Sequence, residues 1–150
     1  MKTKKLILWL LPCAITLALA AACADEKDDY VRPSFGVMTQ EPNPAVAGQN
    51  VTLTFSHNEK GNGIAGVTYT WTVKRLVPDA MTGELKDSVL TVHTNYDGYG
   101  KLDPTLTFRL PAEVAAGSYS VEMDADFQGY IGDVLYDKLP TASRGQLKVQ

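Results

Sequence analysis

Apolar and polar residues alternate with a period of two through most of the chain after Ser34, and this alternation restricts the fold more than any other feature. The clearest case is residues 67–74, Val-Thr-Tyr-Thr-Trp-Thr-Val-Lys. Successive side chains of a β-strand point to opposite faces, so the pattern predicts a strand with one buried face. No segment after residue 22 sustains the 3.6-residue period of a helix. The chain is therefore predicted to be all-β.

Seven segments of this kind are separated by residues that favour turns. They predict strands at residues 35–40, 50–57, 67–74, 87–93, 105–110, 118–128 and 145–150. Each strand has one apolar face, and two antiparallel sheets packed face to face are the usual way to bury such faces.

The first 22 residues have the three parts of a secretory signal. Three lysines within the first five residues precede an apolar stretch, and three alanines supply the small residues before Cys23. Residues 1–22 are therefore predicted to be a cleaved signal peptide. The alternative is an uncleaved membrane helix, because residues 6–22 carry no charge, but Pro12 interrupts this stretch.

Cys23 ends the segment Leu19-Ala20-Ala21-Ala22-Cys23, which resembles the lipobox of bacterial lipoproteins. The acidic cluster at residues 25–29 resembles the surface-export signal of Bacteroidetes-type lipoproteins. Cys13 would be removed with the signal, which leaves Cys23 without a partner for an internal disulfide. The resemblance implies lipidation at Cys23 and an outer-membrane protein exposed at the cell surface, with the periplasmic face as the alternative.

Removal of the signal leaves 128 residues, one domain of ordinary size. Residues 23–33 are predicted to be an acidic flexible tether, and residues 34–150 the folded domain. After removal of the signal the chain has 11 basic and 17 acidic residues, a net charge of −6. Such a domain has no basic face to hold a phosphate backbone, so nucleic acid is not a predicted partner.

Two local features resemble those of immunoglobulin-like domains. Trp71 lies in the middle of the third predicted strand, where that family buries a tryptophan between its sheets. Residues 115–121, Ala-Ala-Gly-Ser-Tyr-Ser-Val, resemble the corner at which the hydroxyl of a tyrosine, here Tyr119, bonds to upstream backbone. Leu53 and Val121 occupy the two positions that hold cysteines in antibody domains. The resemblance is to cysteine-free, PKD-like or fibronectin III-like modules of bacterial surface proteins, and it implies a seven-stranded immunoglobulin-like β-sandwich with an adhesion-type role.

Three predicted connections, residues 57–66, 94–103 and 129–142, are long and lie at one end of such a sandwich. Long loops at one rim often carry function. The candidate ligand contacts in these loops are Tyr96, Asp97, Tyr99, Tyr130 and Tyr136. Tyrosine has an apolar ring and a polar tip, which suit stacking on a sugar or a partner protein. The alternative is that the rings fold back and cap the core. The tether joins at this same end, so the loops would face the membrane or a membrane-embedded partner unless the domain can turn.

The sequence predicts no metal site, no cofactor and no catalytic centre. Glu122, Asp124 and Asp126 form an acidic row on a flat strand face, whereas calcium needs about six to eight converging oxygens, so the row is predicted to be solvated. His57 and His93 are the only histidines and do not have metal-ligand spacing. There is no nucleophile elbow and no glycine-rich phosphate loop.

These features predict a lipid-anchored, non-catalytic binding or adhesion module for a glycan or a surface protein. The alternative is a structural accessory subunit of an outer-membrane complex with no ligand of its own. Exposed tyrosines favour the first, and exposed Ile131 and Leu135 with buried tyrosines favour the second.

Overall fold

The computed structural model describes residues 31–150, so the predicted signal peptide, Cys23 and most of the predicted tether lie outside the described residues. In the described part the chain forms strands and no helix. The strands are β1 (Ser34–Glu41), β2 (Asn50–Glu59), β3 (Ile64–Pro78), β4 (Leu85–Asp97), β5 (Thr105–Arg109), β6 (Gly117–Ile131) and β7 (Val134–Val149). The predicted all-β class is thus confirmed.

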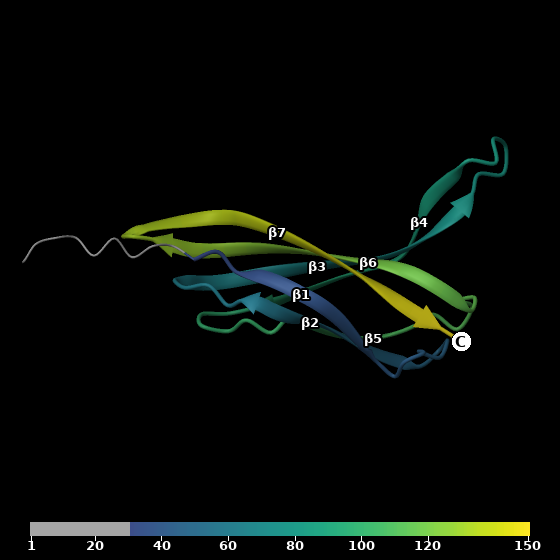
Figure 1. Cartoon of the computed structure of the whole chain (residues 1–150), viewed down its shortest axis with the longest axis horizontal. Coiled ribbons are helices and arrows are strands. Elements are labelled where there is room, and N and C mark those ends of the chain that lie inside the picture. The colour runs from purple at the N-terminus through teal and green to yellow at the C-terminus, as the bar shows by residue number, and fades with distance from the viewer. Residues whose placement is uncertain (1–30) are drawn as a thin grey trace, which may run out of the picture.

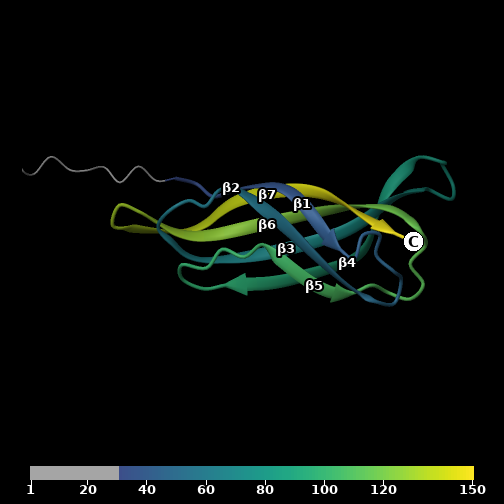
Figure 2. The ribbon, with the colours of Figure 1, turned by 60° about the horizontal axis from the view of Figure 1, so that its bottom comes forward.

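The strands form two antiparallel sheets (Figures 1 and 2). One sheet has the order β1-β2-β5, and the other has the order β4-β3-β6-β7. Every pairing within the two sheets is antiparallel. Strands β4 and β7 are therefore the edges of the four-stranded sheet.

The apolar faces of the two sheets pack against each other to form the core. Trp71 in β3 is fully buried, and its ring centroid lies 5.7 Å from that of Phe55 in β2. The indole Nε1 of Trp71 donates to Asn95 Oδ1 at 2.8 Å, which satisfies the one polar atom of this side chain. Leu53 in β2 and Val121 in β6 are also fully buried. Apolar packing therefore joins the sheets at these positions.

The corner before β6 has the backbone bond expected of the resembled family. The Tyr119 hydroxyl donates to the Ala115 carbonyl oxygen, four residues upstream, at 2.8 Å. The Arg75 guanidinium lies over the Tyr119 ring, 5.4 Å from its centroid. Together these contacts fix the end of the molecule at which β6 begins.

A seam between β1 and β7 closes one side of the two-sheet structure. The side chain of Gln40 donates to the Lys148 carbonyl oxygen (2.9 Å) and accepts from the Lys148 N–H (2.7 Å). Ala45 pairs in parallel with Val149, through bonds that join Ala45 to the backbone of Lys148 and Gln150. On this side the two sheets are joined at the C-terminal end of β7.

Several strands are longer than the alternation predicts, and two predicted long loops are wrong. The chain turns at residues 60–63 and 132–133, instead of forming loops over residues 57–66 and 129–142. Gly129 and Pro140 suggest a loop in sequence, but β7 is an edge strand, where proline is tolerated because one side has no ladder. The β4–β5 connection is residues 98–104, close to the predicted 94–103.

The chain enters the domain three residues before the predicted boundary at Ser34. The Val31 N–H donates to Asn62 Oδ1 at 2.9 Å, and the Asn62 N–H donates back to the Val31 carbonyl oxygen at 3.2 Å. The Arg32 guanidinium donates through Nε to Thr141 Oγ1 in β7 at 3.1 Å. The last residues of the predicted tether are therefore fixed to the β2–β3 turn and to β7.

Candidate functional site

The β2–β3, β4–β5 and β6–β7 connections meet at one end of the molecule, here called the tyrosine end. The Gly100 N–H bonds to the Ile64 carbonyl oxygen (3.5 Å), and the Tyr130 N–H bonds to the Gly63 carbonyl oxygen (2.8 Å). The start of β3 therefore lies between the β4–β5 loop and the β6–β7 hairpin, and it holds both in place.

The structure brings the four candidate tyrosines to this end and leaves all of them exposed. Tyr99 is 82% exposed and Tyr96 61%, while Tyr130 and Tyr136 are 45% and 43% exposed. These rings therefore do not cap the core. Tyr96 is the last residue but one of β4, near the loop that carries Tyr99, whereas Tyr130 and Tyr136 come from the two strands of the β6–β7 hairpin.

A glycine on the neighbouring strand sets the position of Tyr96. Tyr96 pairs with Thr68 in the register of β3 and β4, and its ring reaches across to Gly66. A side chain at residue 66 would meet the Tyr96 hydroxyl. The missing side chain thus makes room for the ring to lie along the sheet surface.

Asp97 does not project from the rim with the tyrosines. Its side chain is buried, with 9% exposed, and its Oδ2 accepts from the Asp103 N–H at 2.7 Å. This hydrogen bond joins the two ends of the β4–β5 loop, the loop that carries the exposed Tyr99. Ligand contact by Asp97 stays a prediction.

Tyr69 lies beneath this loop. Its hydroxyl is buried and has no hydrogen bond in correct geometry within the described residues. Burial raises the pKa of the Tyr69 hydroxyl well above its ordinary value, and the negative charge of nearby Asp97 raises it further. Tyr69 is therefore a neutral, packed side chain.

The outer face of the four-stranded sheet carries an arrangement that sequence reasoning missed. Four charged residues, one from each strand, form an ion-pair ladder: Lys74, Asp87, Glu122 and Arg144. Lys74 Nζ lies 2.9 Å from Asp87 Oδ2 and 3.0 Å from Glu122 Oε2, and Arg144 Nη2 lies 2.9 Å from Glu122 Oε1. Hydrogen bonds from Lys74 and Arg144 lower the pKa of Glu122, while those to Asp87 and Glu122 raise the pKa of Lys74. No local sequence pattern reveals it, because β-sheet register brings the four residues together.

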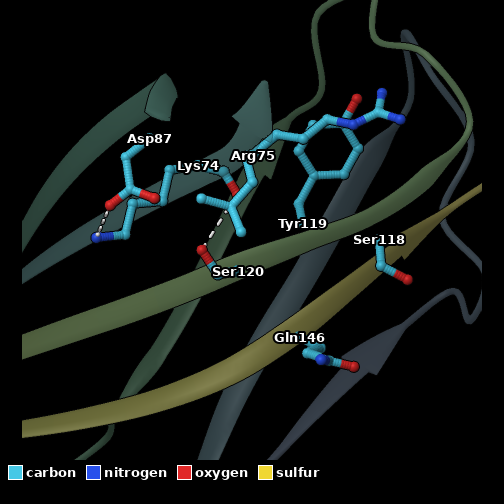
Figure 3. Close-up of a pocket in the computed structure, with 8 residues that line it drawn as sticks. Lys74, Arg75, Asp87, Ser118, Tyr119, Ser120 and Gln146 are labelled. Atoms are coloured by element: carbon cyan, nitrogen blue, oxygen red, sulfur yellow. Dashed lines mark hydrogen bonds and ion pairs between the residues drawn. The ribbon is translucent and has the colours of Figure 1, made fainter. Parts of the chain in front are cut away.

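Two shallow depressions border this ladder. One, of about 320 Å³, lies among Lys74, Arg75, Asp87, Tyr119 and Ser120 (Figure 3). The Ser120 hydroxyl donates to the Lys74 carbonyl oxygen at 3.2 Å. The other, of about 300 Å³, extends past Glu122 to Arg144. Lys74, Asp87, Glu122 and Arg144 pair with one another, whereas Arg75 lies over the Tyr119 ring and has no ion pair among the described residues.

Both histidines are partly buried, and each packs against a phenylalanine of the core. The His93 ring packs against Phe108, with centroids 4.6 Å apart, and its Nε2 lies 2.9 Å from Thr91 Oγ1. Burial lowers the pKa of His93. His57 packs beside Phe35, and its Nε2 is buried without a hydrogen bond among the described residues.

Within residues 31–150, no group of three or more histidine, cysteine, aspartate or glutamate side chains is arranged to hold a metal ion. In the same range, no helix has the length and apolarity that crossing a membrane requires. Cys23, the predicted lipidation site, lies outside the described residues.

No protein-family model matches the chain, and no curated protein matches it. Among solved structures, the chain has a weak similarity to a crystal structure of Spo0M, a sporulation control protein from Bacillus subtilis, with a TM-score of 0.45 and 12% sequence identity. The similarity covers 80% of this chain and 50% of the other, so the chain spans half the length of the protein it matches. A likeness at this level supports no functional conclusion.

Proposed function

We propose that this protein is a lipid-anchored, non-catalytic binding module of the cell surface, which holds a glycan or a surface protein through Tyr96 and Tyr99. The observation that carries the proposal is the exposure of both rings at one end of the two-sheet structure. Exposed aromatic rings with polar tips are the side chains that sugar rings and protein partners most often contact.

The finer assignment to an immunoglobulin-like sandwich belongs to the same proposal. The three-against-four strand arrangement supports it. The buried Trp71 and the bond from the Tyr119 hydroxyl to Ala115 also support it. Such sandwiches commonly carry their binding residues in the loops at one end, which is where Tyr96 and Tyr99 lie.

The lipid anchor at Cys23 is supported by the sequence before and after this residue. A diacylglycerol group gives two acyl chains, which anchor stably where one chain binds only marginally. The protein would then present its ligand surface within reach of the membrane, as a Bacteroidetes-type surface lipoprotein does.

Binding through the tyrosines can be tested with single substitutions and a matched control. Tyr96→Ala and Tyr99→Ala should each weaken binding to the best ligand from glycan and surface-protein screens by roughly tenfold, the usual effect of losing an aromatic contact of about 1.4 kcal/mol. Met81→Ala removes a side chain that is 95% exposed in the β3–β4 connection, at the opposite end, and should leave binding unchanged. Equal affinity of all three variants would refute the tyrosine surface.

Gly66→Ala tests whether the position of Tyr96 matters. The new methyl group would displace the end of a flexible side chain, so the fold should persist while the ring moves. Binding should fall with little change in the free energy of unfolding.

Exposed apolar residues at the opposite end favour the alternative of an accessory subunit. They are Leu76, Met81, Leu85 and Val89 on and beside the β3–β4 hairpin. A photo-crosslinker at residue 81 that couples to one defined outer-membrane protein, while a crosslinker at residue 99 couples to nothing, would favour this second function.

A further inference from the structure

The tip of the β6–β7 hairpin differs from the rest of the two strands that form it. Strand β3 pairs with β6 only as far as Gly129, and beyond it the chain continues as a two-stranded ribbon, residues 130–136, called here the apolar ribbon. In Figure 1 this hairpin extends beyond the neighbouring ends of β2 and β3.

Both faces of the apolar ribbon are apolar. Tyr130 pairs with Leu135, and Ile131 pairs with Val134. Opposed residues of an antiparallel pair lie on the same face, so one face carries Tyr130 and Leu135 and the other carries Ile131 and Val134. Val134 is 55% exposed and Leu135 48%.

This pattern departs from that of the same strand inside the sheet. Between Gly117 and Gly129, β6 alternates strictly between buried apolar residues and outward polar ones, such as Asp124 and Asp126. Two-stranded ribbons are at best marginally stable in water, and exposed apolar faces mark sites of contact with a membrane or a partner. The ribbon thus has apolar surface on both sides and no part of the core to cover it.

The chain enters the domain beside this ribbon. Val31 is bonded to Asn62, and the next residue, Gly63, accepts the backbone bond from Tyr130. Cys23 lies only eight residues before Val31, a reach of about 26–29 Å when fully extended. Anchoring through Cys23 would therefore hold the tyrosine end, with the ribbon as its most protruding part, close to the membrane.

We propose that the apolar ribbon inserts into the interfacial region of the lipid bilayer to which the chain is anchored. The inference rests on the proposed anchoring. Tyrosines are enriched at the membrane interface, where the ring is buried and the hydroxyl stays with the headgroups, and Tyr130 and Tyr136 flank the apolar residues in that way. The ribbon then fixes the orientation of the domain, and Tyr99 and Tyr96 are left for the ligand.

The acidic residues in and near the ribbon determine which lipid headgroups it should prefer. Asp133 occupies the ribbon turn, and the segment between Cys23 and Val31 carries four acidic residues and one lysine. Anionic headgroups would repel these groups. The ribbon is therefore expected to prefer zwitterionic phosphatidylcholine to phosphatidylglycerol.

Tryptophan fluorescence on the full chain tests the proposal. Leu135→Trp places a reporter in the ribbon, and Met81→Trp places a matched reporter at the opposite end of the domain. Both chains are reconstituted into phosphatidylcholine vesicles with brominated acyl chains, and the signal of the unsubstituted chain is subtracted. Leu135→Trp should shift to shorter wavelength and lose roughly half its intensity, since an interfacial segment lies about 5–10 Å into the headgroup and acyl boundary. Met81→Trp should remain unquenched.

A second substitution provides the reverse test. Asp133 in the turn already brings one charge to the ribbon, and insertion requires that its carboxylate stay with the headgroups and water. Adding Val134→Asp to the Leu135→Trp chain replaces an apolar side chain that faces the bilayer by a second charge and should restore unquenched, water-like emission.

The outcomes separate this inference from the anchoring on which it rests. A chain that fails to float with vesicles overturns both. A chain that floats with Leu135→Trp as unquenched as Met81→Trp overturns the ribbon contact alone. A blue shift without quenching by brominated lipid also overturns it, because the ribbon would then be covered by a second copy of the chain.

Discussion

Two buried tyrosines differ in whether their hydroxyl has a partner. The Tyr119 hydroxyl donates to the Ala115 carbonyl oxygen, whereas the Tyr69 hydroxyl is buried close to Asp97 and Asp103 and makes no hydrogen bond of standard geometry in the described part of the chain. An unsatisfied buried hydroxyl opposes folding, and a satisfied one favours it modestly.

Phenylalanine substitution should therefore separate these two residues. Tyr119→Phe should lower the free energy of unfolding by about 1 kcal/mol, the usual value of one hydrogen bond. Tyr69→Phe should leave it unchanged or raise it. Urea unfolding monitored by circular dichroism measures both, and an equal loss in the two variants would show that Tyr69 is bonded in solution.

For single residues, the sequence predicts well which apolar side chains are buried, and it predicts poorly which groups a polar side chain bonds to. Trp71 and Tyr119 are recognisable because their neighbours repeat a known local pattern. Asp97 is not, because nothing near it in sequence shows that its carboxylate bonds the backbone of Asp103. A polar residue between two exposed tyrosines has the same sequence appearance whether it supports the loop or contacts a ligand.

Among the elements, period-two alternation locates strands well and their ends poorly. Each predicted strand overlaps an observed one, but β3, β4, β6 and β7 extend further. Apolar and polar residues alternate in a strand because one of its faces is buried. The alternation ends where a hairpin extends beyond the neighbouring strands and neither face packs on the core. The apolar ribbon is hidden from sequence analysis for this reason, since its residues pack on no core.

The ion-pair ladder is a property of the four-stranded sheet and should respond to acid. Glu122 has its pKa lowered by Lys74 and Arg144, so the stability it contributes is complete above its ordinary pKa and is lost as the pH falls through the lowered value. Glu122→Gln should lower the free energy of unfolding at pH 7 by less than about 1 kcal/mol, as for other partly exposed ion pairs. The substitution should also remove the fall in the free energy of unfolding that the protonation of Glu122 causes at low pH.

Asp124→Asn provides the control for this prediction, because Asp124 lies on the same strand and has no ion pair within the described residues. Unfolding measured at pH 7 and pH 3 should distinguish the two variants. If both variants responded to pH in the same way, the ladder would have no role in stability.

For the whole molecule, the topology places the entry of the chain and the candidate ligand surface at the same end. Sequence analysis predicts this placement from the number of strands alone, because an up-and-down course returns every second connection to the starting end. The seam between β1 and β7 was not predictable, since it depends on the side chain of Gln40 meeting the backbone of Lys148, 108 residues away.

Protease accessibility on intact cells tests the location of the whole domain. The proposed anchoring predicts digestion without lysis for the wild-type chain, and loss of lipid attachment for Cys23→Ala. Protection until lysis would place the domain in the periplasm and favour the accessory-subunit function. Lipid attachment that persists in Cys23→Ala would refute the assignment of the anchor to this residue.

The way in which β1 joins the domain has a mechanical consequence. A pull through residues 31–33 acts along β1, which pairs with β2 over most of its length and is held to β7 through Gln40. Hydrogen bonds between antiparallel strands run perpendicular to the strand axis, so they are loaded together, in shear, only when the opposing force acts at the far end of the molecule, where the β3–β4 connection lies. A ligand held at Tyr96 and Tyr99 pulls at the same end as the tether, so its load falls first on the hydrogen bonds at the Ser34 end of β1 and on the contacts of residues 31 and 32 with Asn62 and Thr141.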